Sequence, residues 1–86
     1  MSRGDPSDGL RRPDLAEICW RMRSRADATR VLECGIYRLN AAYEVRVSYD
    51  NSDLLYAKAV TDLFAGRKLA SELRQPVIER GAFIEW

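Results

Sequence analysis

The sequence predicts a small α+β domain in two layers. We expect a three-stranded antiparallel sheet with a C-terminal helix packed on one face, and a second helix near the N-terminus. Between Tyr43 and Tyr49, apolar residues alternate with polar ones, which is typical of a strand, and the pattern up to Val60 also favours strands. From Thr61 onward they recur with helical spacing. One face of the clearest strand is polar, which indicates a sheet that is covered on a single side.

The chain has 86 residues, enough for one domain, which we place at 14–86. Residues 1–13 are rich in Gly, Pro, Ser, Asp and Arg, so we expect a disordered tail there. A domain of this size buries only about 60% of the surface of its unfolded chain, so its core is thin. Association with a partner would therefore add stability.

Residues 14–26 fit two patterns. As a helix, the segment carries an apolar stripe at positions i, i+3, i+4 and i+7, formed by Leu15, Ile18, Cys19 and Met22. As a strand, it would present arginines on one side and, on the other, Trp20, Met22 and Ser24. We favour the helix because its stripe is longer than the alternation.

The three predicted strands span 30–39, 43–49 and 54–60. The second is the most regular, and its apolar face consists of Tyr43, Val45, Val47 and Tyr49. Gly35 in the first strand indicates a bulge or a close backbone approach. Asp50 and Asp53 flank the last connection and could be a catalytic carboxylate pair. A hairpin turn favours the same residues, so we interpret them as turn residues.

The C-terminal helix is expected over 61–80, with Thr61 or Asp62 as its N-cap and Gly81 as its terminator. Gly66 would let it approach the sheet closely. Pro76 should kink the helix or stop it near Arg74. The predicted core combines the apolar faces of these elements: Ile18, Met22, Cys34, Ile36, Tyr43, Val45, Val47, Leu55, Ala57, Leu63, Ala70, Leu73 and Val77.

The composition excludes several kinds of chemistry. There is no histidine, which removes the commonest general base and metal ligand. Cys19 and Cys34 are too few for a zinc site, and they are the only plausible nucleophiles. We therefore expect no metal, no cofactor and no enzymatic activity. The absence of an apolar leader or membrane-length run favours a cytoplasmic location with both thiols free and no membrane partner.

Two resemblances involve these elements. The order helix, three strands, helix resembles a double-stranded RNA-binding domain in topology, with residues 43–47 similar to its central strand and 66–70 to the basic start of its second helix. We take this resemblance as one of topology only, because the basic pair lies inside the helix and the loop between the first two strands is too short for the family's minor-groove contacts. Residues 31–85 also resemble small uncharacterised bacterial proteins of strand-strand-strand-helix layout. The similar stretches are 34–38, 43–46, 53–55, 73–75 and 81–85, and they imply no particular activity.

The sequence leaves two binding hypotheses. The first is a non-catalytic protein-interaction or regulatory module, whose partner is another protein or a second copy. Its candidate contacts are Phe83, Ile84 and Trp86, since aromatic residues concentrate at binding hot spots, although this segment is more simply explained by folding back over the core. The second is nucleic-acid binding through Arg21, Arg23, Arg25, Arg67, Lys68 and Arg74. The net charge of only +1 disfavours it.

Overall fold

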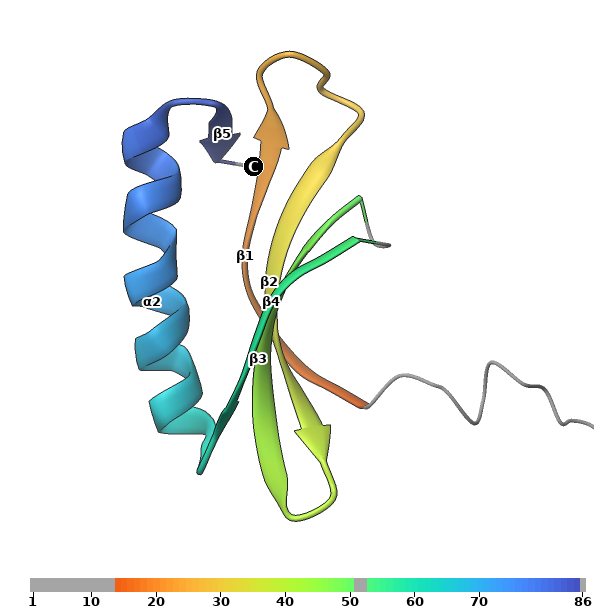
Figure 1. Ribbon diagram of the computed structural model, residues 1–86, viewed down its shortest axis with the longest axis vertical. Helices are drawn as coiled ribbons and strands as arrows, with labels where there is room; N and C mark the ends of the chain where they lie inside the picture. Colours follow the sequence, from red (N-terminus) through yellow and green to blue (C-terminus); the bar gives the residue numbers. More distant parts are fainter. Residues whose placement is uncertain (1–13, 51–52, 86) are drawn as a thin grey trace, which may run out of the picture.

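The computed structural model describes residues 14–50 and 53–85 and shows one twisted antiparallel sheet with one long helix against it (Figure 1). The five strands are β1 (Asp14–Ser24), β2 (Val31–Leu39), β3 (Ala42–Tyr49), β4 (Asp53–Val60) and β5 (Phe83–Glu85). Their order in the sheet is β4-β3-β2-β1-β5, and the helix α2 (Leu63–Arg80) connects β4 to β5. The α+β class is confirmed. The tail predicted at 1–13 lies outside the described residues.

The three-stranded sheet and the N-terminal helix were wrong predictions. The segment 14–26 begins with β1, which is paired with β2 along most of its length. Two bulges, at Ala16 and Cys19, each insert a residue that has no partner in β2. Each bulge shifts the alternation by one residue. Leu15 and Ile18 therefore share one face although they are three residues apart, a spacing that imitates a helix.

The second half of β1 has no bulge, and there the rejected strand interpretation is right. Trp20, Met22 and Ser24 are buried towards the helix, whereas Arg21 and Arg23 are exposed on the other face. Because β1 replaces the predicted helix, the order of elements is four strands, a helix and a strand. The helix, three strands, helix order behind the resemblance to a double-stranded RNA-binding domain is not present.

Helix α2 lies over the middle of the sheet because its sequence allows a close approach. The Asp62 side chain caps the first turn by accepting a hydrogen bond from the Ala65 N–H at 2.8 Å. A Cβ atom on Gly66 would lie 2.9 Å from Ile36 Cδ1 of β2, so the helix packs on the sheet at a position where only glycine fits without a shift. Gly81 ends the helix with φ of 75°, as predicted.

The helix does not stop before Pro76. It continues through this residue to Arg80, with Pro76 on its exposed side. Of the two effects predicted for Pro76, an end near Arg74 is therefore wrong, and a kink stays a prediction. A proline removes one helical hydrogen bond, and water can satisfy the freed carbonyl where that side of the helix faces solvent.

The core lies between α2 and the helix-facing side of β1, β2 and β3. Its buried apolar residues are Trp20, Met22, Leu32, Cys34, Ile36, Val45, Val47 and Ala70. Six of these were predicted, whereas Trp20 and Leu32 were missed. Four further predicted core residues are partly buried and pack against this cluster: Tyr43, Leu63, Leu73 and Val77.

Three core predictions were wrong. Ile18 is aligned with Gly35 and therefore lies on the sheet face opposite α2. Leu55 is the extra residue of a bulge in β4, and its exposed fraction is 61%. Because of this bulge Tyr56, Lys58 and Val60 face the helix side, and Ala57 is exposed on the opposite face.

Candidate interaction surfaces

The sheet face opposite α2 has no helix over it in the described part of the chain (Figure 1). This uncovered face carries charge pairs near its centre. Arg21 Nε donates to Glu33 Oε2 at 2.6 Å, and Arg46 pairs with Glu44. The Arg46 guanidinium also lies 5.3 Å from the centre of the Tyr37 ring. The centre of this face is therefore polar and internally paired.

The six residues predicted to contact nucleic acid do not form one surface. Arg21 and Arg23 lie on the uncovered face. Arg67 and Arg74 extend from α2 towards the sheet, where Arg67 pairs with Glu17 of β1 and Arg74 pairs with Glu85 of β5. The remaining two are Arg25, whose Nε donates to the Gly81 carbonyl at 2.6 Å, and Lys68, which is exposed on the helix.

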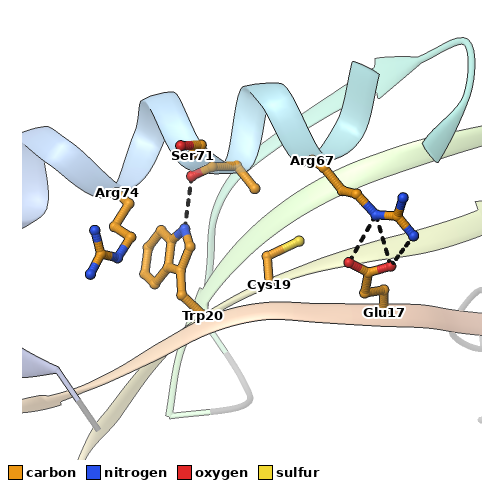
Figure 2. A pocket seen from close by; sticks show the side chains of 7 residues that line it. Glu17, Cys19, Trp20, Arg67, Ser71 and Arg74 are labelled. Carbon is orange, nitrogen blue, oxygen red and sulfur yellow. Dashed lines mark hydrogen bonds and ion pairs between the residues drawn. The ribbon is translucent and has the colours of Figure 1, made fainter. Parts of the chain in front are cut away.

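An open pocket of about 280 Å³ lies between α2 and the first half of β1 (Figure 2). Its lining residues are Glu17, Cys19, Trp20, Arg67, Ala70, Ser71 and Arg74. The indole Nε1 of Trp20 donates to the Ala70 carbonyl at 2.8 Å, which fixes the floor of the pocket against the helix.

The Arg67 guanidinium closes one end of this pocket through two nitrogens that donate to the Glu17 carboxylate, at 2.8 and 3.1 Å (Figure 2). These hydrogen bonds lower the pKa of the Glu17 carboxyl below its usual value, and Glu17 in turn raises the pKa of Arg67. Both groups are charged at neutral pH. Because each neutralises the other, the pocket offers no unpaired charge from this pair for a ligand.

The two thiols are not activated. Burial, and then the neighbouring charge of Glu17, raise the pKa of Cys19. Burial raises the pKa of Cys34 to about 12. Both residues are thus protonated thiols at neutral pH, whereas a cysteine nucleophile acts as a thiolate. The hypothesis of a thiolate made reactive by a nearby arginine has no support in this geometry.

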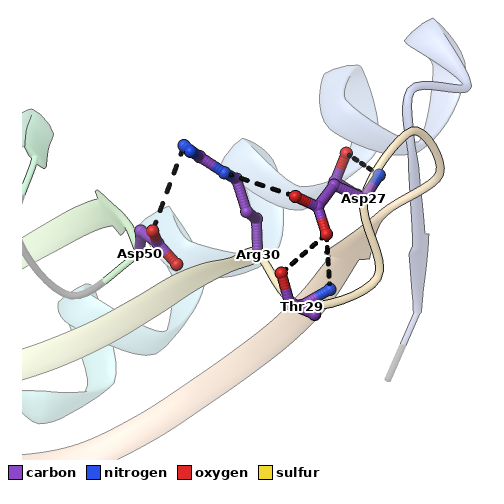
Figure 3. Close-up of polar contacts among 5 residues, drawn as sticks. Asp27, Thr29, Arg30 and Asp50 are labelled. Atoms are coloured by element: carbon purple, nitrogen blue, oxygen red, sulfur yellow. Dashed lines mark hydrogen bonds and ion pairs between the residues drawn. The ribbon is translucent and has the colours of Figure 1, made fainter.

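The turn residues form a polar cluster at the end of the sheet (Figure 3). The Asp27 carboxylate accepts hydrogen bonds from the Thr29 hydroxyl and N–H, which lower its pKa, and lies 3.6 Å from the Arg30 Nε. Asp50 adopts φ of 60°, and its N–H donates to the Val31 carbonyl at 2.7 Å. These contacts stabilise the turns that connect the strands. Asp50 is therefore a turn residue, as the sequence analysis expected.

The C-terminal residues divide between core and surface. Phe83 is aligned with Ser24 on the helix side, and its ring meets the Tyr49 ring edge to face with centres 6.1 Å apart. Ile84 lies on the uncovered face and is 42% exposed. Phe83 thus covers the core, and Ile84 remains a candidate contact. Trp86 lies outside the described residues.

The two outer strands differ in what lies beside them. Strand β5 covers the last three residues of β1, from Met22 to Ser24. Strand β4 pairs with β3 and has no other neighbour in the described sheet, so its outer edge presents unpaired backbone groups. Two of its leucines are strongly exposed, Leu54 at 53% and Leu55 at 61%. The sequence prediction placed Leu55 in the core and therefore missed that this leucine is exposed at the edge.

No group of metal-ligating side chains occurs in the described ranges 14–50 and 53–85, and the one helix there is not apolar enough to cross a membrane. The chain matches no model of a protein family, no curated protein and no solved structure. Its function must therefore be inferred from its own residues.

Proposed function

We propose that the protein is a non-catalytic interaction module that self-associates through the outer edge of β4, so that two sheets join into one. The single observation that carries this proposal is an apolar edge strand, β4, whose outer edge has no neighbouring strand within residues 14–50 and 53–85. A strand of this kind is a ready template for pairing with another chain.

The composition of β4 supports pairing with a second copy. Six of its eight residues are apolar: Leu54, Leu55, Tyr56, Ala57, Ala59 and Val60. Six of the eight positions are also exposed in the isolated chain. Burying such residues stabilises a complex by roughly 25 cal/mol for each Å² of apolar surface. The part from Tyr56 to Val60 has no bulge and can form a regular ladder.

Lys58 selects the register of this pairing. Two copies of β4 could pair as antiparallel strands related by a two-fold axis. If this axis passed through Lys58, the two Lys58 ammonium groups would lie directly opposite each other, and like charges in this position destabilise a sheet. An axis through Ala57 avoids this contact. It aligns Ala57 with Ala57 of the second copy and Lys58 with the Tyr56 ring of the second copy, which is a favourable cation–π arrangement. The regular ladder about this axis joins Tyr56, Ala57 and Lys58 of each copy, and it ends where the bulge at Leu55 begins.

Analytical ultracentrifugation over a range of concentrations tests the proposal with Ala57→Asp. This substitution places two carboxylates opposite each other at the axis, so we expect dimerisation to weaken by about tenfold or more. Gln75→Asp is the matched control because it adds the same charge to an exposed position of α2. A chain that sediments as a monomer at all concentrations, or an Ala57→Asp variant that dimerises like the control, would refute the proposal.

Nucleic-acid binding is the weaker candidate. The exposed arginines of β1 and the Arg46–Tyr37 pair on the uncovered face support it. Glu33 and Glu44 on the same face oppose it, because they neutralise Arg21 and Arg46. Titration with duplex RNA at low salt distinguishes the two proposals, since electrostatic binding is strongest there. We expect no salt-dependent binding. A cytoplasmic location suits either proposal, because both cysteines are free.

A further inference from the structure

We propose that Cys19 and Cys34 are a redox-sensitive pair, which closes into an intramolecular disulfide when the protein meets a peroxide. The pair is independent of the β4 edge, because it lies on the other side of the sheet. It would make the protein responsive to oxidation whether or not it self-associates.

The bulge in β1 brings the two cysteines together. Cys34 of β2 is aligned with Trp20, and Cys19 is the extra residue immediately before Trp20. In a bulge, two residues of one strand oppose a single residue of the other, so Cys19 also lies opposite Cys34. The two thiols are also close enough for each to influence the pKa of the other. Opposed residues of antiparallel strands have Cα atoms about 4.5–5.5 Å apart, and a disulfide spans about 4.4–6.8 Å.

The surroundings of the two thiols give them different roles. Cys19 is partly exposed and lines the pocket beside α2, so a small oxidant can reach it (Figure 2). Cys34 is fully buried in the core. We therefore assign Cys19 as the thiol that reacts first and Cys34 as the thiol that resolves the product. The raised pKa of both groups makes the reaction slower than in a dedicated peroxidase.

The chemistry balances with hydrogen peroxide as the only co-reactant. The thiolate form of Cys19 attacks one peroxide oxygen and the O–O bond breaks. The hydroxide that leaves takes up the proton lost by the Cys19 thiol, so the products are a sulfenic acid and water. The Cys34 sulfur then attacks the Cys19 sulfur, and the hydroxyl group leaves with the Cys34 proton as a second water. Two thiols are oxidised to one disulfide while one peroxide is reduced to two waters. A dithiol reductant reverses the change.

The disulfide would join β1 to β2 at the bulge and remove the Cys19 thiol from the pocket. A cross-link between residues 19 and 34 also restricts the unfolded chain. We expect the oxidised protein to unfold at a higher temperature than the reduced protein, and the difference should disappear after reduction.

Mass spectrometry of the full chain after peroxide treatment tests this proposal. We expect the intact mass to fall by two hydrogen atoms and iodoacetamide to modify neither cysteine under denaturing conditions. Trypsin cleaves after arginine, so the fragment ending at Arg21 should remain bonded to the fragment Val31–Arg38 until a reductant is added. This linked pair of peptides identifies the bond directly.

Cys19→Ser is the matched variant because this position tolerates a polar group at the pocket. Its Cys34 should remain a thiol after the same treatment, and its unfolding temperature should not respond to peroxide. The proposal is overturned if peroxide leaves both thiols of the unmodified chain reduced, converts Cys19 to a sulfinic acid, or links chains to each other while Cys34 stays free.

Discussion

The sheet has β4 at one end of its strand order and β1 with β5 at the other, and these two ends are attached to the rest of the protein in different ways. We call them the β4 side and the β1 side. On the β1 side, Trp20 and Met22 are buried under α2, the Glu17–Arg67 pair spans strand and helix, and β5 covers part of the edge. On the β4 side, the exposed fractions of Leu54 and Leu55 exceed one half, at 53% and 61%. Both strands are largely apolar in sequence. The burial of the side chains, and not their composition, therefore decides which end of the sheet stabilises the monomer. The end whose apolar side chains are exposed remains available to a partner.

Alanine substitutions on the two sides should give the largest contrast. Trp20→Ala removes a buried indole and its hydrogen bond to Ala70, so we expect it to lower the free energy of unfolding by about 3–5 kcal/mol. Leu55→Ala removes an exposed side chain and should change it by less than about 0.5 kcal/mol. Urea denaturation at a concentration where the protein is monomeric measures both. Equal losses would show that β4 supports the monomer as much as β1 does.

Trp20→Phe keeps this test informative if the alanine variant does not fold. The ring remains, while the donor to the Ala70 carbonyl is lost, so the expected cost includes about 1 kcal/mol for the hydrogen bond. A phenylalanine variant as stable as the unmodified protein would mean that this hydrogen bond contributes nothing to the attachment of α2.

A substitution at Gly66 tests which strand supports the helix. Gly66 packs against Ile36 of β2, with only 2.9 Å available between a Cβ atom and Ile36 Cδ1. Gly66→Val should therefore destabilise the fold by about 1–3 kcal/mol through overpacking. Lys68→Val, at an exposed position of α2, is the control for the helix propensity of valine. If both variants were equally stable, α2 would not be pressed against the centre of the sheet.

The sequence predicts the elements whose pattern is undisturbed. In β3 each residue alternates strictly, so its apolar face and its packing under α2 were correct. The cap at Asp62 and the close approach at Gly66 were also predictable, because each depends on residues near in sequence or on the lack of a side chain. These parts require no knowledge of distant partners.

The errors have one physical origin. A bulge is defined by the partner strand, and no local pattern in β1 or β4 shows that Cys19 or Leu55 is an extra residue. Each bulge moved the following side chains to the opposite face. The exposure of Leu55 and the position of Cys19 beside Cys34 were therefore hidden for the same reason, since both depend on where the bulges occur.

The smallest expected effect concerns the exposed Glu17–Arg67 pair on the β1 side. The folded-state pKa of Glu17 is lowered from 4.5, so its contribution to stability is present above pH 4.5 and is lost as the pH falls through the lowered value. Glu17→Gln should thus be slightly less stable than the unmodified protein at pH 6, and the difference should shrink towards pH 3. Asp27, whose pKa is also lowered, titrates in both proteins and cancels in the comparison.

Thermal unfolding between pH 3 and pH 6 measures this difference, with Glu72→Gln as the control on the exposed side of α2. If the ion pair is the cause, the unfolding temperature of the Glu72→Gln control should change with pH in the same way as that of the unmodified protein. High salt should reduce the Glu17→Gln effect, because the pair is accessible to solvent and its attraction is screened. If the stability difference between Glu17→Gln and the unmodified protein stayed constant from pH 6 to pH 3, the Glu17 side chain would contribute through packing and not through its charge. The ion pair would then not be a reason why the β1 side is better attached than the β4 side.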